Sequence, residues 1–213
     1  MRRVVLVSGA PGAGKSTLAG PLAAELGFAL LTKDQIKETL HDALAPSAPG
    51  PGAPGVPGAP GSPDGLGSAR LAAPDGAVLA AGEVSLAWSR WLGGASMELL
   101  WMLAGQVPDA VLEANFRPHL AYERGRILAL GASVVEVHCA CPPVLAAQRY
   151  TARAARGATR HPVHVVTRLT PELLAEFDQP VGIGQLISVD TTAPVDVAGL
   201  ARAIRALLPA ALP

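Results

Sequence analysis

The sequence predicts an α/β fold in which a five-stranded parallel sheet lies between two layers of helices. Short apolar runs, typical of strands buried in a parallel sheet, alternate along the chain with segments whose apolar residues recur at helical spacing. The first apolar run, residues 4–7, leads directly into a glycine-rich loop and then into a helical pattern. This alternation of strand and helix is the signature of parallel βα units.

The composition is that of a globular protein with an aliphatic core. The chain has 213 residues, 50% of them hydrophobic and only 4% aromatic. That length suits one domain, so we expect residues 1–213 to form a single unit with a core of Val, Leu and Ala. Lys and Arg total 17, as do Asp and Glu, so no overall field favours nucleic acid or an anionic membrane.

Cysteine usage and the N-terminus indicate the compartment. Cys139 and Cys141 are separated by one residue, too close for an ordinary structural disulfide and too few for a zinc site. Met1 is followed by two arginines and an apolar run, but that run stops at Ser8, before a signal peptide could form. No stretch is long and apolar enough to span a bilayer. We therefore expect a soluble, cytoplasmic protein without a membrane partner.

The most specific motif lies in residues 8–17. Gly9, Gly14, Lys15 and Ser16 satisfy the spacing G-x-x-x-x-G-K-[ST], between a strand and a helix as the motif requires. The glycines let the backbone turn tightly with its N–H groups inward, and the following helix adds the positive end of its dipole. Lys15 would reach the β and γ phosphates of a nucleotide, and the Ser16 hydroxyl would ligate Mg²⁺. The expected nucleotide-binding residues are Gly9, Ala10, Pro11, Gly12, Ala13, Gly14, Lys15, Ser16 and Thr17. The fold class is therefore a P-loop NTPase three-layer sandwich.

The second βα unit places an acid near this loop. A helix over 15–26 ends at Gly27, a buried strand follows over 28–31, and a second helix runs from about 35 to 44. Asp34 follows the carboxyl end of the strand, where ligands of open α/β sheets bind. Asp34 is thus a candidate base for an acceptor hydroxyl, with an N-cap of the second helix as the alternative.

Residues 46–79 differ from the rest of the chain. Glycine recurs at every third position from Gly52 to Gly61, with prolines between. Such a segment lacks apolar surface to bury, so we expect a disordered insertion. It is either a tolerated surface insertion or a tract that docks a partner.

A helical pattern over 84–103 contains all three tryptophans, Trp88, Trp91 and Trp101, which either line a substrate pocket or belong to the core. Gly93 and Gly94 would bend or divide this helix.

The third strand, over 109–114, is followed by a helix over 119–129 and a fourth strand over 133–139. Glu113 ends the third strand, where the acid of a Walker B motif would fall. It is a candidate for holding Mg²⁺ through a water or for contacting substrate.

A helix over about 144–156 carries arginines without carboxylate partners. Arg149, Arg153, Arg156 and Arg160 are spaced by four, three and four residues, and no acidic residue occurs between Glu136 and Glu172. Either a ligand supplies their counter-charges or they form a solvated face. We expect a helical lid over about 142–168 that closes over the phosphates, with Arg149 and Arg153 on the transferred group.

Two histidines follow in this lid, His161 and His164, but they lack the further nearby ligands of a metal site. The last strand spans 186–190 and the last helix 196–208. Asp190 and Thr191 end this strand and either border the nucleotide base or form an ordinary turn into the helix.

Four segments carry a family resemblance: residues 9–17, Thr32-Lys33-Asp34-Gln35-Ile36-Lys37, Val111-Leu112-Glu113-Ala114-Asn115-Phe116, and Arg149 and Arg153 with Arg160-His161-Pro162. Together they resemble the small P-loop kinases that include polynucleotide kinase, chloramphenicol phosphotransferase and the zeta toxins. The resemblance covers most of the chain except the insertion.

The resemblance implies ATP as phosphate donor and Mg²⁺ as metal. It makes Asp34 the catalytic base or acceptor-binding acid and Lys37 a ligand for an acceptor phosphate. The lid arginines map to Arg149 and Arg153, and Arg160 is a further candidate for binding substrate. Glu113 departs from the family pattern, which has aspartate at this position.

The predicted function is transfer of the γ-phosphate of ATP to a hydroxyl of a small molecule, with Lys15, Asp34, Arg149 and Arg153 catalytic. Neutral overall charge disfavours a polynucleotide acceptor, which would need a basic channel. An ATPase or nucleotide-binding switch without an acceptor is the main alternative. The N-K-x-D motif of GTPases and the Asp-Glu pair of AAA+ engines are absent. A third reading is an interaction protein whose insertion binds a partner.

Overall fold

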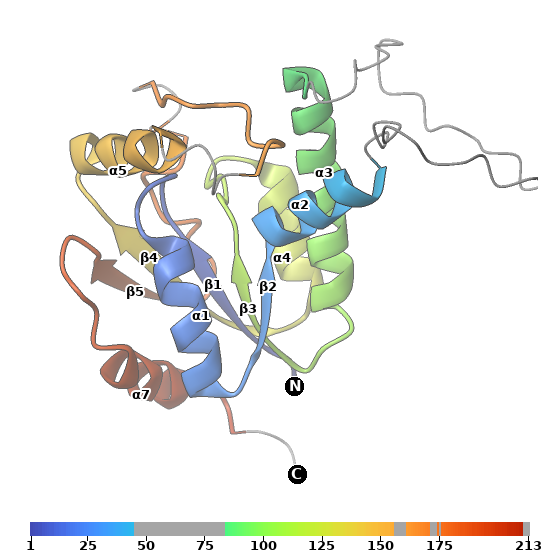
Figure 1. The fold of residues 1–213 in the computed structure, drawn as a ribbon. Helices are drawn as coiled ribbons and strands as arrows, with labels where there is room; N and C mark the ends of the chain where they lie inside the picture. The colour runs from blue at the N-terminus through green and yellow to red at the C-terminus, as the bar shows by residue number, and fades with distance from the viewer. Residues whose placement is uncertain (45–83, 156–160, 171–173, 175, 211–213) are drawn as a thin grey trace, which may run out of the picture.

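The computed structural model describes residues 1–44, 84–155, 161–170, 174 and 176–210. Its centre is one five-stranded parallel sheet with the strand order β2-β3-β1-β4-β5 (Figure 1), which confirms the predicted fold class. The strands are β1 (Arg3–Ser8), β2 (Ala29–Thr32), β3 (Asp109–Glu113), β4 (Ser133–Ala140) and β5 (Gln185–Asp190). The proposed insertion over 46–79 lies outside the described residues.

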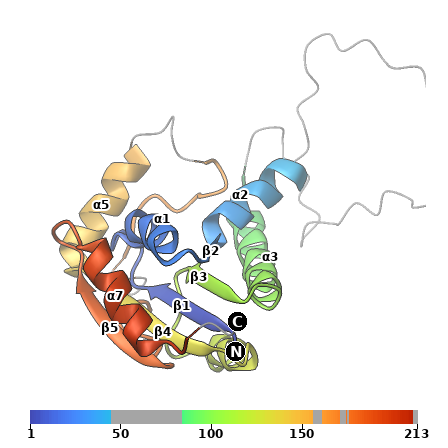
Figure 2. The same ribbon diagram turned by 90° about the horizontal axis from the view of Figure 1, so that it is seen from below.

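Helices cover both faces of the sheet (Figure 2). They are α1 (Lys15–Leu26), α2 (Lys33–Leu44), α3 (Leu86–Ala104), α4 (Ala121–Ala129), α5 (Pro143–Ala155) and α7 (Val197–Leu207). Side chains of β1 alternate between the faces, as the period of a strand requires. Val5 and Val7 pack in one cluster with residues of α1 and α7, and Val4 and Leu6 pack in another with residues of α3 and α4. No helix among the described residues is long and apolar enough to cross a membrane.

Strand β2 is less buried than the sequence predicted. It spans Ala29–Thr32 rather than 28–31, and only Thr32 is buried while Ala29 is exposed. The reason is its place in the sheet, because β2 is an edge strand that pairs with β3 alone. An apolar run does not distinguish a central strand from an edge strand.

Two helices also differ from prediction. Helix α2 begins at Lys33, so Asp34 is its second residue and the N-cap alternative for Asp34 is wrong. Helix α3 is continuous through Gly93 and Gly94, which neither divide nor end it. Ser85 caps its N-terminus by accepting a hydrogen bond from the backbone N–H of Trp88.

A fully buried carboxylate ties the sheet to the segment before β5. Glu136 in β4 is 0% exposed and accepts hydrogen bonds from the Ser8 hydroxyl (2.5 Å) and the backbone N–H groups of Val181 and Gly182 (2.8 Å each). The Ser8 hydroxyl also lies 3.0 Å from Nδ1 of His138. The Glu136 side chain thus satisfies three buried or half-buried donors at once.

We expect Glu136→Ala to lower the free energy of unfolding by about 3 kcal/mol or more, because several donors lose their acceptor together. Urea unfolding followed by circular dichroism measures this. Glu136→Gln, which keeps one acceptor oxygen, should cost clearly less. Equal stability of Glu136→Ala and the unchanged protein would show that water replaces the carboxylate.

Candidate active site

The loop between β1 and α1 has the geometry of a phosphate cradle. Gly9, Gly12 and Gly14 have φ angles of 130°, 85° and 89°, a region that other residues rarely adopt. A Cβ atom at Gly12 would collide with the carbonyl oxygen of Ala146 in α5. At Gly12 the loop therefore packs directly against α5, the helix predicted as a lid.

Lys15 holds positive charge inside this loop. Its Nζ donates to the carbonyl oxygens of Gly9 and Ala10 at 2.9 Å each, and the residue is 5% exposed. Burial lowers the pKa of Lys15, and the nearby Glu113 carboxylate opposes this effect.

Ser16 and Glu113 form a pair of oxygen donors at the end of β3. The Ser16 hydroxyl donates to Oε1 of Glu113 over 3.3 Å. Burial raises the pKa of Glu113, against the opposing effect of Lys15. A hydroxyl and a carboxylate suit Mg²⁺, which usually keeps several waters and takes phosphate oxygens for the rest of its shell. Within the described residues, no group of three or more His, Cys, Asp or Glu could hold a metal by itself.

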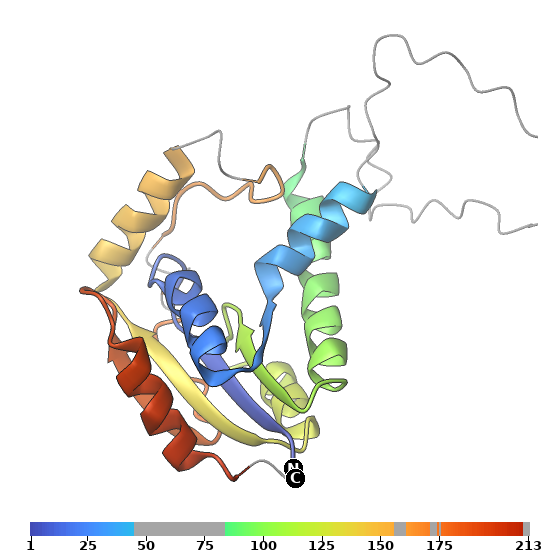
Figure 3. The same ribbon diagram turned by 60° about the horizontal axis from the view of Figure 1, so that its bottom comes forward.

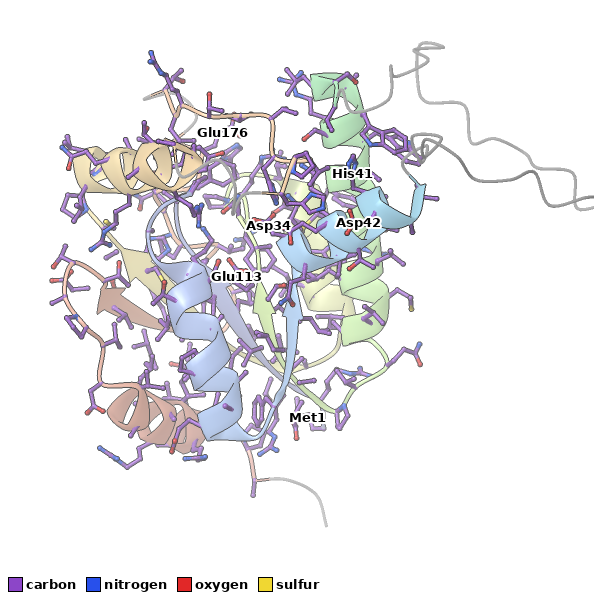
Figure 4. All side chains as sticks on the ribbon, in the orientation of Figure 1. Met1, Asp34, His41, Asp42, Glu113 and Glu176 are labelled. Carbon is purple, nitrogen blue, oxygen red and sulfur yellow. The ribbon has the colours of Figure 1, made fainter. Side chains whose placement is uncertain are left out.

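Asp34 lies beside this pair. It opens α2 at the carboxyl end of β2, next to the end of β3 that carries Glu113 (Figure 4). Its side chain is 48% exposed, and one carboxylate oxygen is 3.3 Å from Nζ of Lys33. Burial alone would raise the pKa of Asp34, but Lys33, His164 and Lys15 together outweigh it and lower that pKa.

Lys37 is held by the protein itself. Its Nζ donates to the Ser89 hydroxyl (2.7 Å) and to the carbonyl oxygen of Val163 (3.4 Å), and the residue is 6% exposed. Ser89 also donates to the Val163 carbonyl, over 2.7 Å. Lys37 thus links α2 to α3 and to the segment around Val163.

Arg149 and Arg153, the two arginines predicted to act from a lid, lie on α5 and line the same cavity. Arg149 donates to the carbonyl oxygens of Thr191 (2.9 Å) and Thr192 (3.2 Å). The guanidinium of Arg153 lies over the ring of Tyr150, 5.6 Å from its centroid. Arg156 and Arg160 lie outside the described residues.

Thr191 has a role that the sequence did not indicate. Its hydroxyl lies 2.7 Å from the carbonyl oxygen of Ala13 in the phosphate loop and 3.0 Å from that of Ala140 in β4. Asp190 instead accepts from the backbone N–H of Thr192 at 2.8 Å, which lowers its pKa. Thr191 therefore holds the phosphate loop in place. Asp190 stabilises the turn into the last helix, which was the second of the two alternatives for this residue.

Residues 161–166, which we name the strap, cross the site from the side of α5 toward α2 and α3 (Figure 3). The fully buried Val163 packs with Trp88 and Leu92 of α3. The Tyr150 hydroxyl donates to the carbonyl oxygen of Val166 over 2.7 Å. The strap is thus fixed to α3 at one end and to α5 at the other.

Two histidine–carboxylate pairs also bind the strap to α2. His161 lies 2.9 Å from Asp42, and His164 lies 2.8 Å from Glu38. Their sequence separations of 119 and 126 residues explain why spacing alone could not reveal them.

One cavity of about 1150 Å³ joins these groups. Its walls include residues from the phosphate loop, α2, the strap and the turn after β5, among them Lys15, Ser16, Asp34, Lys37, Glu113, Asn115, Arg149 and Arg153. None of the three tryptophans lines it. Trp88 and Trp101 are buried in the core clusters and Trp91 packs beside Trp88, so the core alternative holds for them. Asn115, which follows the end of β3, also lines the cavity, and no motif in the sequence predicts a role for it.

The parallel sheet and the phosphate loop define a nucleotide-binding protein with a P-loop kinase-like fold. The chain belongs to the AAA domain family (AAA_33), which matches residues 4–180. Strand β3 ends in Leu112-Glu113, without the Asp-Glu pair of AAA+ engines. A comparison with curated proteins gave no match.

Solved structures share the fold. A protein described as a candidate kinase from Chloroflexus aurantiacus is 25% identical, with a TM-score of 0.72 over 98% of this chain and 99% of that one. The APS kinase CysC from Mycobacterium tuberculosis, solved with AMPPNP and APS, is 16% identical, with a TM-score of 0.52 over 97% of this chain and 96% of that one. At that identity the second match supports the fold alone.

Proposed function

We propose that the protein is an ATP-dependent kinase that transfers the γ-phosphate of ATP to a hydroxyl of a small molecule. The observation that carries this proposal is the single cavity in which the phosphate loop, the Ser16–Glu113 pair, Asp34 and the lid arginines meet. These are the parts that phosphoryl transfer needs: a phosphate cradle, a metal site, a group for the acceptor hydroxyl and positive charge on the migrating group.

Each residue has a role in this scheme. The loop amides and Lys15 bind the β and γ phosphates, and Arg149 and Arg153 neutralise charge on the transferred group. Asp34 accepts a hydrogen bond from the acceptor hydroxyl and orients it. Ser16 and Glu113 hold Mg²⁺, which when bound neutralises charge on the β and γ oxygens.

The sequence resemblance to polynucleotide kinase, chloramphenicol phosphotransferase and the zeta toxins supports a hydroxyl acceptor. Lys37 and Arg160 remain proposed acceptor ligands. For Lys37, such a role requires its ammonium to exchange the Ser89 or Val163 oxygen for a substrate oxygen.

The test is release of ADP by purified protein with Mg²⁺, alone and with a panel of acceptors. The panel comprises nucleosides, sugar nucleotides, aminoglycoside and chloramphenicol-type antibiotics, and 5′-hydroxyl oligonucleotides. Acceptor-dependent release with a phosphorylated product supports the kinase. Slow release that no acceptor stimulates supports the alternative, an ATPase or nucleotide-binding switch.

Glu113→Gln should raise the Mg²⁺ concentration needed for half-maximal turnover by roughly tenfold or more, because a neutral amide loses the charge-assisted contact worth about 1.5–3 kcal/mol. A Mg²⁺ titration of ADP release at saturating ATP measures this. Glu98→Gln, a change at an exposed carboxylate of α3, is the control. An unchanged titration for Glu113→Gln would remove this residue from the metal site.

A further inference from the structure

The strap contributes an imidazole to the cavity wall. His164 lies in the cavity wall together with Asp34 and Glu38 of α2. Its Nε2 is 2.8 Å from Oε1 of Glu38, and its side chain is 18% exposed. Because an ionised carboxylate can only accept, the proton of a neutral His164 lies on Nε2. Among the described residues no partner bonds its Nδ1, which leaves that lone pair to accept a proton.

A carboxylate that fixes the tautomer of a histidine is the arrangement of a general base. We propose that the Glu38–His164 pair takes the proton of the acceptor hydroxyl, with Nδ1 of His164 as the atom that receives it. The proposal rests on the proposed kinase function. In this proposal, Asp34 orients the acceptor hydroxyl and stabilises the imidazolium that forms on His164.

The acceptor oxygen forms a bond to the γ-phosphorus as its O–H bond breaks. The P–O bond to ADP breaks, with the electron pair staying on ADP. The proton passes to Nδ1 of His164, and water removes it after the product leaves.

The charges around His164 favour this role over Asp34. Burial lowers the pKa of His164, so it is neutral at pH 7, while Asp34 and Glu38 oppose that effect and Lys37 adds to it. His161 is the other titratable group nearby, with its ring centroid 6.4 Å away. Since the pKa of Asp34 is itself lowered, its carboxylate is the weaker base.

The neighbouring histidines do not fit the same role. Nδ1 of His161 accepts from the backbone N–H of Val163 (3.2 Å) and its Nε2 faces Asp42, so both ring nitrogens are engaged. His41 accepts from Nε1 of Trp88 (3.1 Å) and is not part of the cavity wall. His161 therefore offers a matched control: a histidine tied by the same strap to the same helix.

The experiment compares His164→Gln with His161→Gln in the full chain, using the acceptor found in the ADP-release assay. Glutamine keeps a donor toward the carboxylate of α2. We expect His164→Gln to lower kcat roughly 10²-fold or more with little change in KM. The unchanged protein should lose activity as the pH falls through the lowered pKa of His164, since the imidazole must be neutral, and this acid limb should vanish in His164→Gln. His161→Gln should keep the limb.

Equal kcat losses in the two variants, or an acid limb that persists in His164→Gln, would overturn the inference. The tautomer gives a second readout that needs no acceptor: ¹⁵N NMR of the protein with Mg²⁺ and AMPPNP should show His164 protonated on Nε2 and bare at Nδ1 at pH 7. A proton on Nδ1 would also overturn it. Absence of acceptor-dependent ADP release from the unchanged protein would instead refute the proposed function itself.

Discussion

Asp34→Asn should strongly slow phosphoryl transfer while leaving ATP binding intact. The amide is isosteric but uncharged, so it neither holds the acceptor hydroxyl as a carboxylate does nor stabilises positive charge on His164. A group that assists proton transfer contributes typically about 10²–10⁴-fold, and we expect kcat to fall within that range. ADP release with acceptor gives the rate, and calorimetry with AMPPNP gives the affinity.

Asp42→Asn is the matched control for Asp34→Asn. Asp42 lies on the same helix, eight residues later, with its side chain 70% exposed and paired to His161. Turnover of this variant should stay close to that of the unchanged protein. Full turnover of Asp34→Asn would refute a role for Asp34 in handling the acceptor.

Lys15→Ala should remove most nucleotide affinity and turnover. The change deletes the only ammonium inside the described phosphate loop, and one preorganised donor at a transferring group is worth roughly 10²–10³-fold in kcat. The loop also loses the two hydrogen bonds from Nζ to Gly9 and Ala10.

Fluorescent ATP-analogue binding and ADP release measure the two effects of Lys15→Ala. Arg202→Ala, on the exposed side of α7, serves as the control. Melting temperatures of both variants separate lost binding from lost folding. Normal affinity in Lys15→Ala would mean that the backbone amides alone bind the phosphates.

The fold was predictable because its signals are local. Each strand lies within about one residue of its predicted position, since apolar runs bounded by turn residues mark strands wherever they pack. Strand order has no such signal. The edge position of β2, and with it the exposure of Ala29, follows from pairing between distant segments.

The residues of the candidate site likewise fall into those that a local sequence pattern predicts and those that only the folded structure brings together. Lys15 and Ser16 could be found because one loop of ten residues contains all the groups that define the motif. Asp34 and Glu113 could be found because the carboxyl ends of parallel strands meet at one edge. The pairing of His164 with Glu38 has no sequence signal, because the two residues are 126 positions apart.

The clamp at Thr191 connects helix α5 to the phosphate loop. Arg149 of α5 donates a hydrogen bond to the backbone oxygen of Thr191. The Thr191 hydroxyl in turn donates one to the backbone oxygen of Ala13 in the phosphate loop. A movement of α5 that carries Arg149 with it therefore pulls on the nucleotide cradle itself. In the proposed kinase, an outward movement of α5 and the release of ADP should accordingly occur as a single kinetic event.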